Sequence, residues 1–239
     1  MIDIFDQFNV ASKLGADICL SGGASGADRA WGLAAEKANH TVVHWSFKGH
    51  KPSTNKNIFI LDDEELKEAD PYLEKANKSL KRRIPYKKPW ILNLLRRNWY
   101  QIKYTDAVYA VSEIEDWAFD DTYTKDHEPG TSYNMPMGVK GGTGWACQMY
   151  FDRWMVEHTD RNLHPIESGD LAGNPALWFP WFKLYVFDQK REQAYKWIPH
   201  MTCWVKVDDI PTPSGTYTGI GTRDLTEAGQ AWIDSLYIP

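Results

Sequence analysis

The chain has 239 residues, of which 43% are hydrophobic and 25% charged, a balance typical of a soluble globular protein. Its net charge of −5 provides no general attraction to polyanions, so a long nucleic acid is not an expected partner. No stretch approaches the roughly 20 apolar residues of a membrane span, and the N-terminus lacks the features of a signal peptide. We therefore expect a cytoplasmic protein with no membrane partner.

The N-terminal part of the chain has the pattern of a βαβ unit. Apolar spacing predicts an amphipathic helix over residues 3–14, and a short apolar run at 17–20 predicts a strand that ends at a glycine-rich loop, 21–28. An alanine-rich stretch from 28 to about 39 predicts a helix, and 41–45 predicts the next strand. This succession implies a parallel sheet with a right-handed crossover.

The middle of the chain contains two insertions. Residues 62–90 are a charged helical insertion, acidic and then basic, expected as one or two surface helices whose basic part is a solvated face or an oligomer contact. Residues 90–101 predict a helix, and 106–112 a buried strand. The polar loop at 113–140 that follows is long, and such loops tend to be functional or mobile.

The C-terminal part returns to strands and helices. A glycine cluster, 141–144, opens a helix expected to run to about Val156. Strands are expected at 183–188 and, at an edge, 202–207; the strand and glycine turn of 216–223 then lead into a last helix. We therefore expect one Rossmann-like α/β domain over residues 1–239, a parallel sheet flanked by helices with insertions.

Cysteine and histidine usage favours no metal site. The 3 cysteines are too few and too scattered for a disulfide framework or a zinc site, and their apolar surroundings predict buried structural thiols. The 7 histidines lack metal-binding spacing. His44 and His50 flank the loop after a strand and could either reach a ligand pocket or serve the structure. We expect neither a metal nor a cofactor.

Three glycine-rich junctions, 21–28, 141–144 and 219–223, each join an expected strand to an expected helix. The carboxyl ends of parallel strands lie at one edge of a sheet, where ligands bind. Glycine there leaves space for a phosphate, and the following helix attracts an anion. Arg223 could add a bidentate contact, and Asp28 could cap its helix or bind a ligand hydroxyl. One shared ligand pocket is expected; the alternative is that the turns serve packing only.

The glycine loop matches neither the dinucleotide fingerprint G-x-G-x-x-G nor the P-loop G-K-[ST], which excludes the usual dehydrogenase and NTPase classes. Residues Ser21–Ala30 instead resemble the SGGAxGAD loop of the SLOG superfamily. This Rossmann-like group includes DprA-like, LOG-like and molybdenum-cofactor-carrier-like proteins and many phage proteins. Weaker resemblance lies in the segments 97–101, 106–111, 141–146 and 186–188, with Trp197 downstream.

One departure from the SLOG pattern concerns the order of segments. A GIGSR strand normally comes first in these proteins, whereas its counterpart here, Gly219–Arg223, lies near the end of the chain. We interpret this as a circular permutation, which is tolerated where termini lie close together at the surface. It predicts that the strand at 216–220 lies beside the strand at 17–20.

The resemblance implies a nucleotide-type ligand, such as an ADP-ribose derivative or a cyclic nucleotide, and a homo-oligomer. It also implies a phage anti-defence role in the host cytoplasm, in which the protein sequesters a nucleotide immune signal. Trp145, or an aromatic residue of the 113–140 loop, would cover the base. The expected ligand-binding residues are Ser21, Gly22, Gly23, Ala24, Ser25, Gly26, Asp28, Arg97, Asn98, Gly141, Gly142, Thr143, Gly144, Trp145, Gly219, Gly221, Thr222 and Arg223.

Two other functions stay open. LOG-like enzymes hydrolyse the N-glycosidic bond of nucleoside monophosphates with an acidic residue on the helix after the glycine turn. Gln148 on that helix cannot replace a carboxylate; Asp152, one turn further, is either a substitute or a solvated charge near Arg153. Ligand binding without turnover is therefore the leading hypothesis. A nucleotide N-glycosidase, as a LOG-like phosphoribohydrolase or NAD-type hydrolase, is the alternative, and an interaction scaffold is the third.

Overall fold

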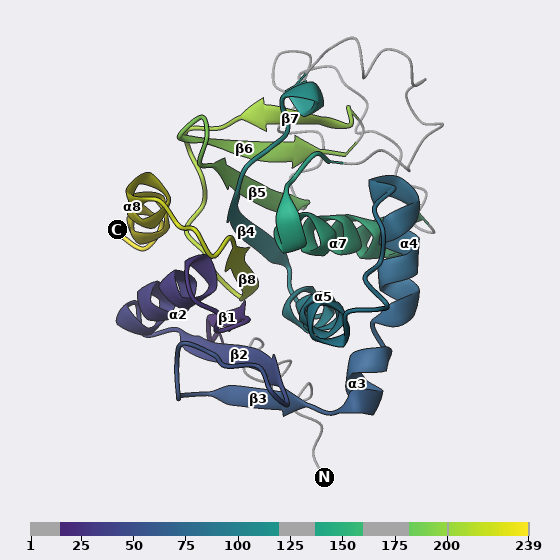
Figure 1. The fold of residues 1–239 in the computed structure, drawn as a ribbon. Helices are drawn as coiled ribbons and strands as arrows, with labels where there is room; N and C mark the ends of the chain where they lie inside the picture. Colours follow the sequence, from purple (N-terminus) through teal and green to yellow (C-terminus); the bar gives the residue numbers. More distant parts are fainter. Residues whose placement is uncertain (1–14, 120–136, 160–181, 200, 239) are drawn as a thin grey trace.

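A computed structural model describes residues 15–119, 137–159, 182–199 and 201–238. These residues build one eight-stranded sheet in the order β3-β2-β1-β8-β4-β5-β6-β7 (Figure 1). The helix expected at 3–14 and most of the 113–140 loop lie outside the described residues. At the ends of that loop, Asp116–Phe119 form the 3-10 helix η1, and Ile114 forms an isolated bridge with Val139.

Most of the sheet is parallel, as expected; among the described strands, only β6 runs antiparallel to its neighbours, β5 and β7. Parallel strands are covered on both faces, so their sequences are apolar throughout rather than alternating. β4 has this character, and all 6 of its residues are buried. The strands are β1 (Ile18–Ser21), β2 (Thr41–Phe47), β3 (Ile58–Leu61), β4 (Ala107–Ser112), β5 (Lys183–Asp188), β6 (Gln193–Ile198), β7 (Cys203–Lys206) and β8 (Thr216–Gly221).

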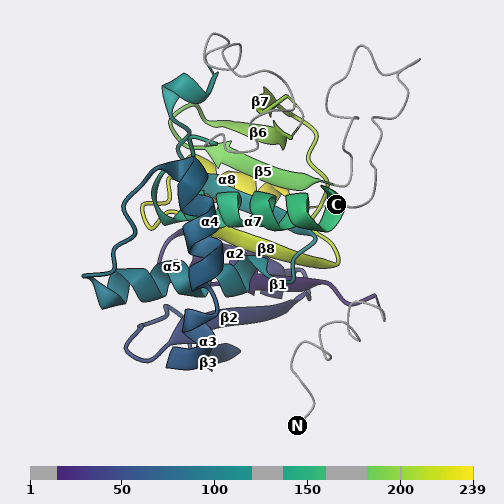
Figure 2. The ribbon, with the colours of Figure 1, turned by 90° about the vertical axis from the view of Figure 1, so that its right-hand side faces the viewer.

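Helices cover both faces of the sheet. α2 and α8 lie on one face, and α5 and α7 on the other, with α4 packed against α7 (Figures 1 and 2). Each face encloses its own cluster of buried apolar side chains, the arrangement of a three-layer α/β domain. The helices are α2 (Ala27–Lys37), α3 (Asp63–Lys67), α4 (Asp70–Leu80), α5 (Pro89–Ile102), α7 (Gly141–Thr159) and α8 (Glu227–Ser235).

The charged insertion at 62–90 contains a pair of helices, α3 and α4, but they are more than a surface addition. Asp62 begins α3 with a capping box in which its side chain and that of Glu65 accept each other's backbone N–H groups. Leu66 of α3 and Leu73 of α4 are almost fully buried in the main core. The charged residues therefore account only for the outer face of these helices, whereas the inner face is part of the core.

After β1 and after β4, the two neighbours of β8, the chain proceeds toward opposite edges of the sheet. From β1 it passes through α2 to β2, and from β4 through α7 to β5, on the other side of the sheet. β8 lies between β1 and β4, at the point where the strand order reverses. In open α/β sheets the crevice beyond the carboxyl ends of the strands at such a point is the preferred ligand site.

The predicted neighbourhood of the C-terminal strand is confirmed. β8 pairs in parallel with β1, with Ile18 opposite Thr216. On its other side β8 pairs in parallel with β4. The strand ends at Ser21, Gly221 and Ser112 therefore lie at one edge of the sheet, while the circular permutation itself stays a prediction.

The cysteines lie in two kinds of surroundings. Cys19 and Cys147 are buried, and burial raises the pKa of both thiols to about 12. Cys203 is only half-buried on the edge strand β7, so the expectation of a buried thiol is wrong there. No helix in the described part of the chain is both long and apolar enough to cross a membrane.

Candidate functional site

The glycine loop after β1 encloses a cation. A Cβ added at Gly22 would lie 1.0 Å from Nη1 of Arg97, so the loop passes over the Arg97 guanidinium at a distance that only glycine permits. Arg97 lies on α5 and is 4% exposed. The space that we expected a phosphate to use beside Gly22 is therefore filled by an arginine of the chain itself.

Asp28 joins the three segments of this region. Its Oδ2 accepts a hydrogen bond from Arg97 Nη1 at 3.1 Å, and its Oδ1 accepts one from the backbone N–H of Gly221 at 3.2 Å. The carboxyl is 3% exposed, and this burial raises its pKa, which the nearby Arg97 counteracts. α2 begins after Gly26 without a side-chain cap. Asp28 thus links the glycine loop, α5 and the end of β8, a role outside both sequence-based alternatives.

The first and third glycine turns pack on each other. Gly26 has a φ of +84°, and a Cβ there would lie 2.3 Å from the carbonyl oxygen of Arg223. Next to it, the N–H of Ala27 donates to the Thr222 carbonyl at 2.9 Å. Gly219 lies against the ring of the buried Trp31. These glycines therefore serve close packing, which was the alternative explanation for each turn.

At the start of α7, side chains of neighbouring segments hydrogen-bond to the backbone carbonyl groups. Asn98 Nδ2 donates to the Gly142 carbonyl at 3.1 Å, and Arg82 donates to the carbonyls of Val139 and Gly141 at 2.7 and 2.9 Å. The first intrahelical bond runs from the Gly144 N–H to the Lys140 carbonyl. The preceding N–H groups of a helix have no intrahelical acceptor and carry the positive end of its dipole.

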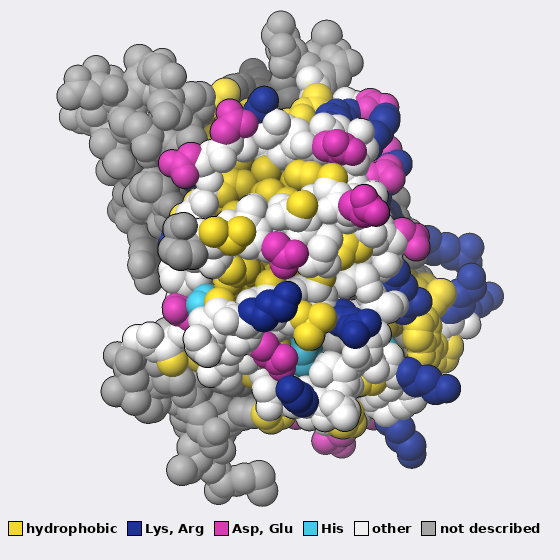
Figure 3. All heavy atoms as spheres, turned by 90° about the vertical axis from the view of Figure 1, so that its left-hand side faces the viewer, with side chains coloured by type: hydrophobic (Ala, Val, Ile, Leu, Met, Phe, Trp, Pro, Cys, Tyr) yellow, Lys and Arg dark blue, Asp and Glu magenta, His cyan; other side chains and the backbone are white. Residues whose placement is uncertain are grey.

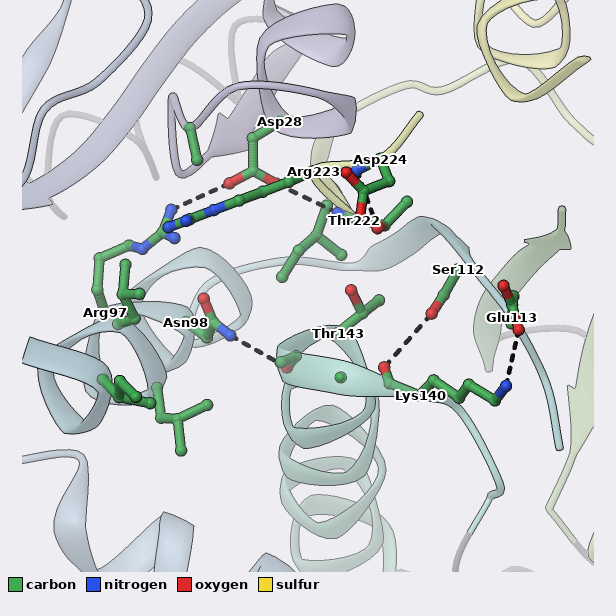
Figure 4. Close-up of a pocket in the computed structure, with 18 of the residues that line it drawn as sticks. Asp28, Arg97, Asn98, Ser112, Glu113, Lys140, Thr143, Thr222, Arg223 and Asp224 are labelled. Atoms are coloured by element: carbon green, nitrogen blue, oxygen red, sulfur yellow. Dashed lines mark hydrogen bonds and ion pairs between the residues drawn. The ribbon is translucent and has the colours of Figure 1, made fainter. Parts of the chain in front are cut away.

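A cavity of about 530 Å³ lies between these segments (Figure 4). Arg97, Asp28 and Arg223 lie along one side of it, with Ser112, Glu113 and Lys140 across from them, and Thr143 points into the space between. The lining residues are Ala24, Asp28, Trp90, Ile91, Leu94, Leu95, Arg97, Asn98, Ser112, Glu113, Lys140, Gly141, Gly142, Thr143, Gln189, Ile220, Gly221, Thr222, Arg223 and Asp224.

The structure brings ten of the expected ligand-binding residues to this cavity and places the others elsewhere. Trp145 is buried in the core and does not line the cavity, so it is not placed to cover a base there. Trp90, which the sequence did not single out, lines the cavity. The other expected residues that do not line it are Ser21, Gly22, Gly23, Ser25, Gly26, Gly144 and Gly219.

Sequence reasoning also missed charged residues at the cavity. Lys140 Nζ donates to Glu113 Oε2 at 2.7 Å, and Asp224 follows Arg223 directly (Figure 4). Glu113 comes one residue after β4 and Asp224 three residues after β8. The signal that could have found them is this position, because residues just past the carboxyl ends of neighbouring parallel strands converge.

Asp152, the substitute catalytic carboxylate considered above, does not line the cavity. It is 7% exposed, so it is not a solvated charge either. Gln148 Nε2 donates to its Oδ1 at 3.0 Å, and burial raises the pKa of the carboxyl to about 6. Among the described residues there is no group of three or more His, Cys, Asp or Glu that could hold a metal ion.

Comparison with known proteins gives no family assignment. No protein-family model, curated protein or solved structure matches the chain. The site is therefore interpreted from its own geometry.

Proposed function

We propose that the protein binds a nucleotide or nucleotide-derived small molecule in the 530 Å³ cavity. The phosphate would lie between Arg97, Arg223 and the first N–H groups of α7, where charge and free donors converge. Ligand pockets of drug-sized molecules have volumes of roughly 300–1,000 Å³, so the cavity has room for a nucleotide.

The observation that carries this proposal is that the Arg97 side chain is charged, buried and at the cavity. Its guanidinium is buried, lines the cavity and pairs with a single carboxylate, Asp28. Its Nε has no hydrogen-bond partner among the residues that the structure describes. Burial lowers the pKa of the Arg97 guanidinium, because a charge that is removed from water costs free energy. A guanidinium has five N–H donors and the Asp28 carboxylate accepts from Nη1, so an anion in the cavity can contact the same guanidinium.

The remaining lining suits the rest of a nucleotide. Ile91, Leu94 and Ile220 offer apolar surface to a base, whereas Ser112 and Thr143 offer hydroxyls to a sugar. Several Lys and Arg side chains lie along the right-hand edge of the molecule in Figure 3. In the cavity lining, Asp28 and Glu113 are paired with Arg97 and Lys140. Arg223 forms no ion pair with a described carboxylate and is the cation that an anionic ligand can use.

Calorimetry of the full chain with AMP, GMP, CMP, UMP and ADP tests the proposal. We expect at least one to bind, and we expect Arg97→Met and Arg223→Met each to weaken it about tenfold or more, the loss for a charged hydrogen bond. The control is Arg29→Met, an exposed arginine beside the glycine loop that does not line the cavity. No binding by any of the five, or equal losses in the control, would contradict the proposal.

We infer that the ligand is retained without turnover, because Gln148 stands where LOG-like enzymes have an acidic residue; the resemblance to phage SLOG proteins supports sequestration of a nucleotide signal as the biological role. Heat denaturation of the calorimetry sample and chromatography of the supernatant should return the nucleotide unchanged. Appearance of free base would replace retention by hydrolysis.

The carboxylates of Glu113 and Asp224 at the cavity favour N-glycosidic hydrolysis as the second candidate. Two carboxylates flanking a glycosidic bond can act as acid and nucleophile or base. For this function, release of adenine from AMP or nicotinamide from NAD should be lost in Glu113→Gln or Asp224→Asn. It should persist in Asp152→Asn, because Asp152 lies outside the cavity.

A further inference from the structure

The main cavity has a neighbour. A second cavity of about 360 Å³ shares Ala24, Trp90 and Arg223 with it and is otherwise lined by Ser25, Gly49, His50 and Lys51. The loop after β2 thus adds a second compartment beside the glycine loop. The two compartments meet at Trp90 and Arg223, which come from the start of α5 and the turn after β8.

Trp90 is unusually placed for so large an apolar side chain. It lies in the first turn of α5, directly after Pro89, and is 45% exposed. The Arg223 guanidinium carbon lies 5.3 Å from the centroid of its ring, within the range of a cation–π contact. An exposed indole at the boundary of two cavities provides a flat surface on which a second ring system can stack.

The boundary is cationic. Neither Arg223 nor Lys51 forms an ion pair with a described carboxylate. His50 accepts or donates a hydrogen bond with Ser46 Oγ at 2.9 Å. Its pKa is lowered to about 4 by burial and by the charges of Arg97 and Arg223, so near pH 7 the ring is neutral. The smaller cavity therefore combines two neutral rings, those of His50 and Trp90, with the cationic side chains of Lys51 and Arg223.

We propose that the ligand is a dinucleotide-type molecule, with two ring-bearing halves joined by a phosphate or pyrophosphate linkage. The linkage lies at Arg223, one half fills the main cavity, and the other enters the smaller cavity with its base against Trp90. This inference rests on the proposed function and adds to it the second half of the ligand. A mononucleotide confined to the main cavity would leave His50 and Lys51 without a role.

Calorimetry with matched one-half and two-half probes tests the inference. The pairs are ADP against diadenosine diphosphate and GDP against diguanosine diphosphate, which carry the same base and linkage in both halves. We expect the dinucleotide of at least one pair to bind about tenfold more tightly than its mononucleotide, as stacking of one further base provides. Trp90→Ala should abolish this difference, because the dinucleotide loses the stacking surface for its second base and the mononucleotide has no second base to lose.

Two variants complete the design. Trp90→Phe retains an aromatic face and should keep most of the difference, while Tyr86→Ala removes an exposed aromatic residue outside both cavities and should keep all of it. Equal binding of both members of each pair, or a difference that survives in Trp90→Ala, would overturn the two-half ligand and leave the proposed function standing. Failure of all four probes would overturn the two-half ligand, and the proposed function would fall with it only if AMP, GMP, CMP and UMP also fail to bind.

Discussion

The glycine-rich turns differ in what surrounds them. In the turns after β1 and β8, a Cβ at Gly22, Gly26 or Gly219 would strike a side chain or backbone atom at 2.3 Å or less. At the start of α7, a Cβ at Gly141 would meet nothing within 4 Å, and one at Gly142 would come no closer than 3.6 Å, to Asn98 Nδ2. Gly144, further along the same turn, is enclosed, since a Cβ there would lie 2.0 Å from the Val139 carbonyl oxygen. The turns after β1 and β8 thus use glycine for packing, whereas the first two residues of α7 border open space.

A glycine-rich turn alone is therefore not evidence of a phosphate contact. The turns after β1 and β8 hold each other and seat Arg97, so their part in ligand binding is to position a cation. The start of α7 offers free backbone donors to the cavity. The variants below, in decreasing order of expected effect, test whether the glycines of the two regions have these different roles.

Gly26→Ala should have the largest effect on stability. The added Cβ would overlap the backbone of Thr222 and Arg223 and would sit at a φ of +84°; overpacking and a positive φ together cost about 3–5 kcal/mol. Urea unfolding gives the change. The control is Gly141→Ala, with a positive φ of +63° but open space, which should cost only about 1 kcal/mol. Equal losses would remove the distinction between the two regions.

Gly22→Ala should destabilise by about 2–4 kcal/mol, because Arg97 must move away and leave the buried Asp28 carboxylate without its partner. A double-mutant cycle with Arg97→Met isolates the cause. Without the guanidinium, the clash of the added methyl group with Arg97 is removed and only its 2.4 Å approach to Asp28 Oδ2 remains. The double variant should therefore lose clearly less stability than the sum of the two single losses. Simple addition of the two losses would show that Gly22 acts through something else.

Asp152→Asn addresses a carboxyl that is buried away from the cavity. Its pKa is about 6 in the folded protein and about 3.9 in an unfolded chain, so the folded state holds the extra proton between these values. Its contribution to stability therefore falls as pH rises from 4 to 6, by roughly 2–3 kcal/mol in all. Asp152→Asn should flatten this part of the stability profile and raise stability at pH 8. An unchanged profile would assign the pH dependence to other groups.

Gly142→Ala should have the smallest effect on stability, within about 0.5 kcal/mol of the parent, because space is available and alanine favours a helix. It should nevertheless weaken the best-binding mononucleotide several-fold, since the methyl group narrows the cavity beside the free N–H groups. Unchanged affinity, measured by calorimetry, would show that the phosphate does not approach this end of α7.

Much of the fold could be predicted because its signals are local. The strands β1, β4 and β8 are short apolar runs next to glycines, and the helices between them show clear apolar periodicity. The sequence prediction missed β3 and β6. β3 is a continuous apolar run of only four residues at the edge of the sheet, with Ile60 60% exposed, so its signal was present but short. β6 contains Gln193 and Lys196 and is an antiparallel strand, so it lacks the continuous apolar pattern of a central parallel strand.

The sequence could predict where the candidate site lies but not all of the residues that line it. Ten of its residues were expected because they belong to glycine turns or to the SLOG-like segments. Trp90 and Trp145 are both tryptophans near the start of a helix, and only the packing of each helix decides that Trp90 faces the cavity and Trp145 the core. Residue type alone does not contain that orientation.

By itself, the sequence determined the alternation of strands and helices and the placement of glycine-rich turns after β1 and β8, because periodicity and backbone freedom are properties of neighbouring residues. Only the tertiary structure decided that Arg97 fills the space at Gly22, that Asp28 links it to Gly221, and that Trp90 and Arg223 stand between two cavities. These contacts join residues far apart in the chain, and they exist only because the parallel sheet brings its strand ends to one edge.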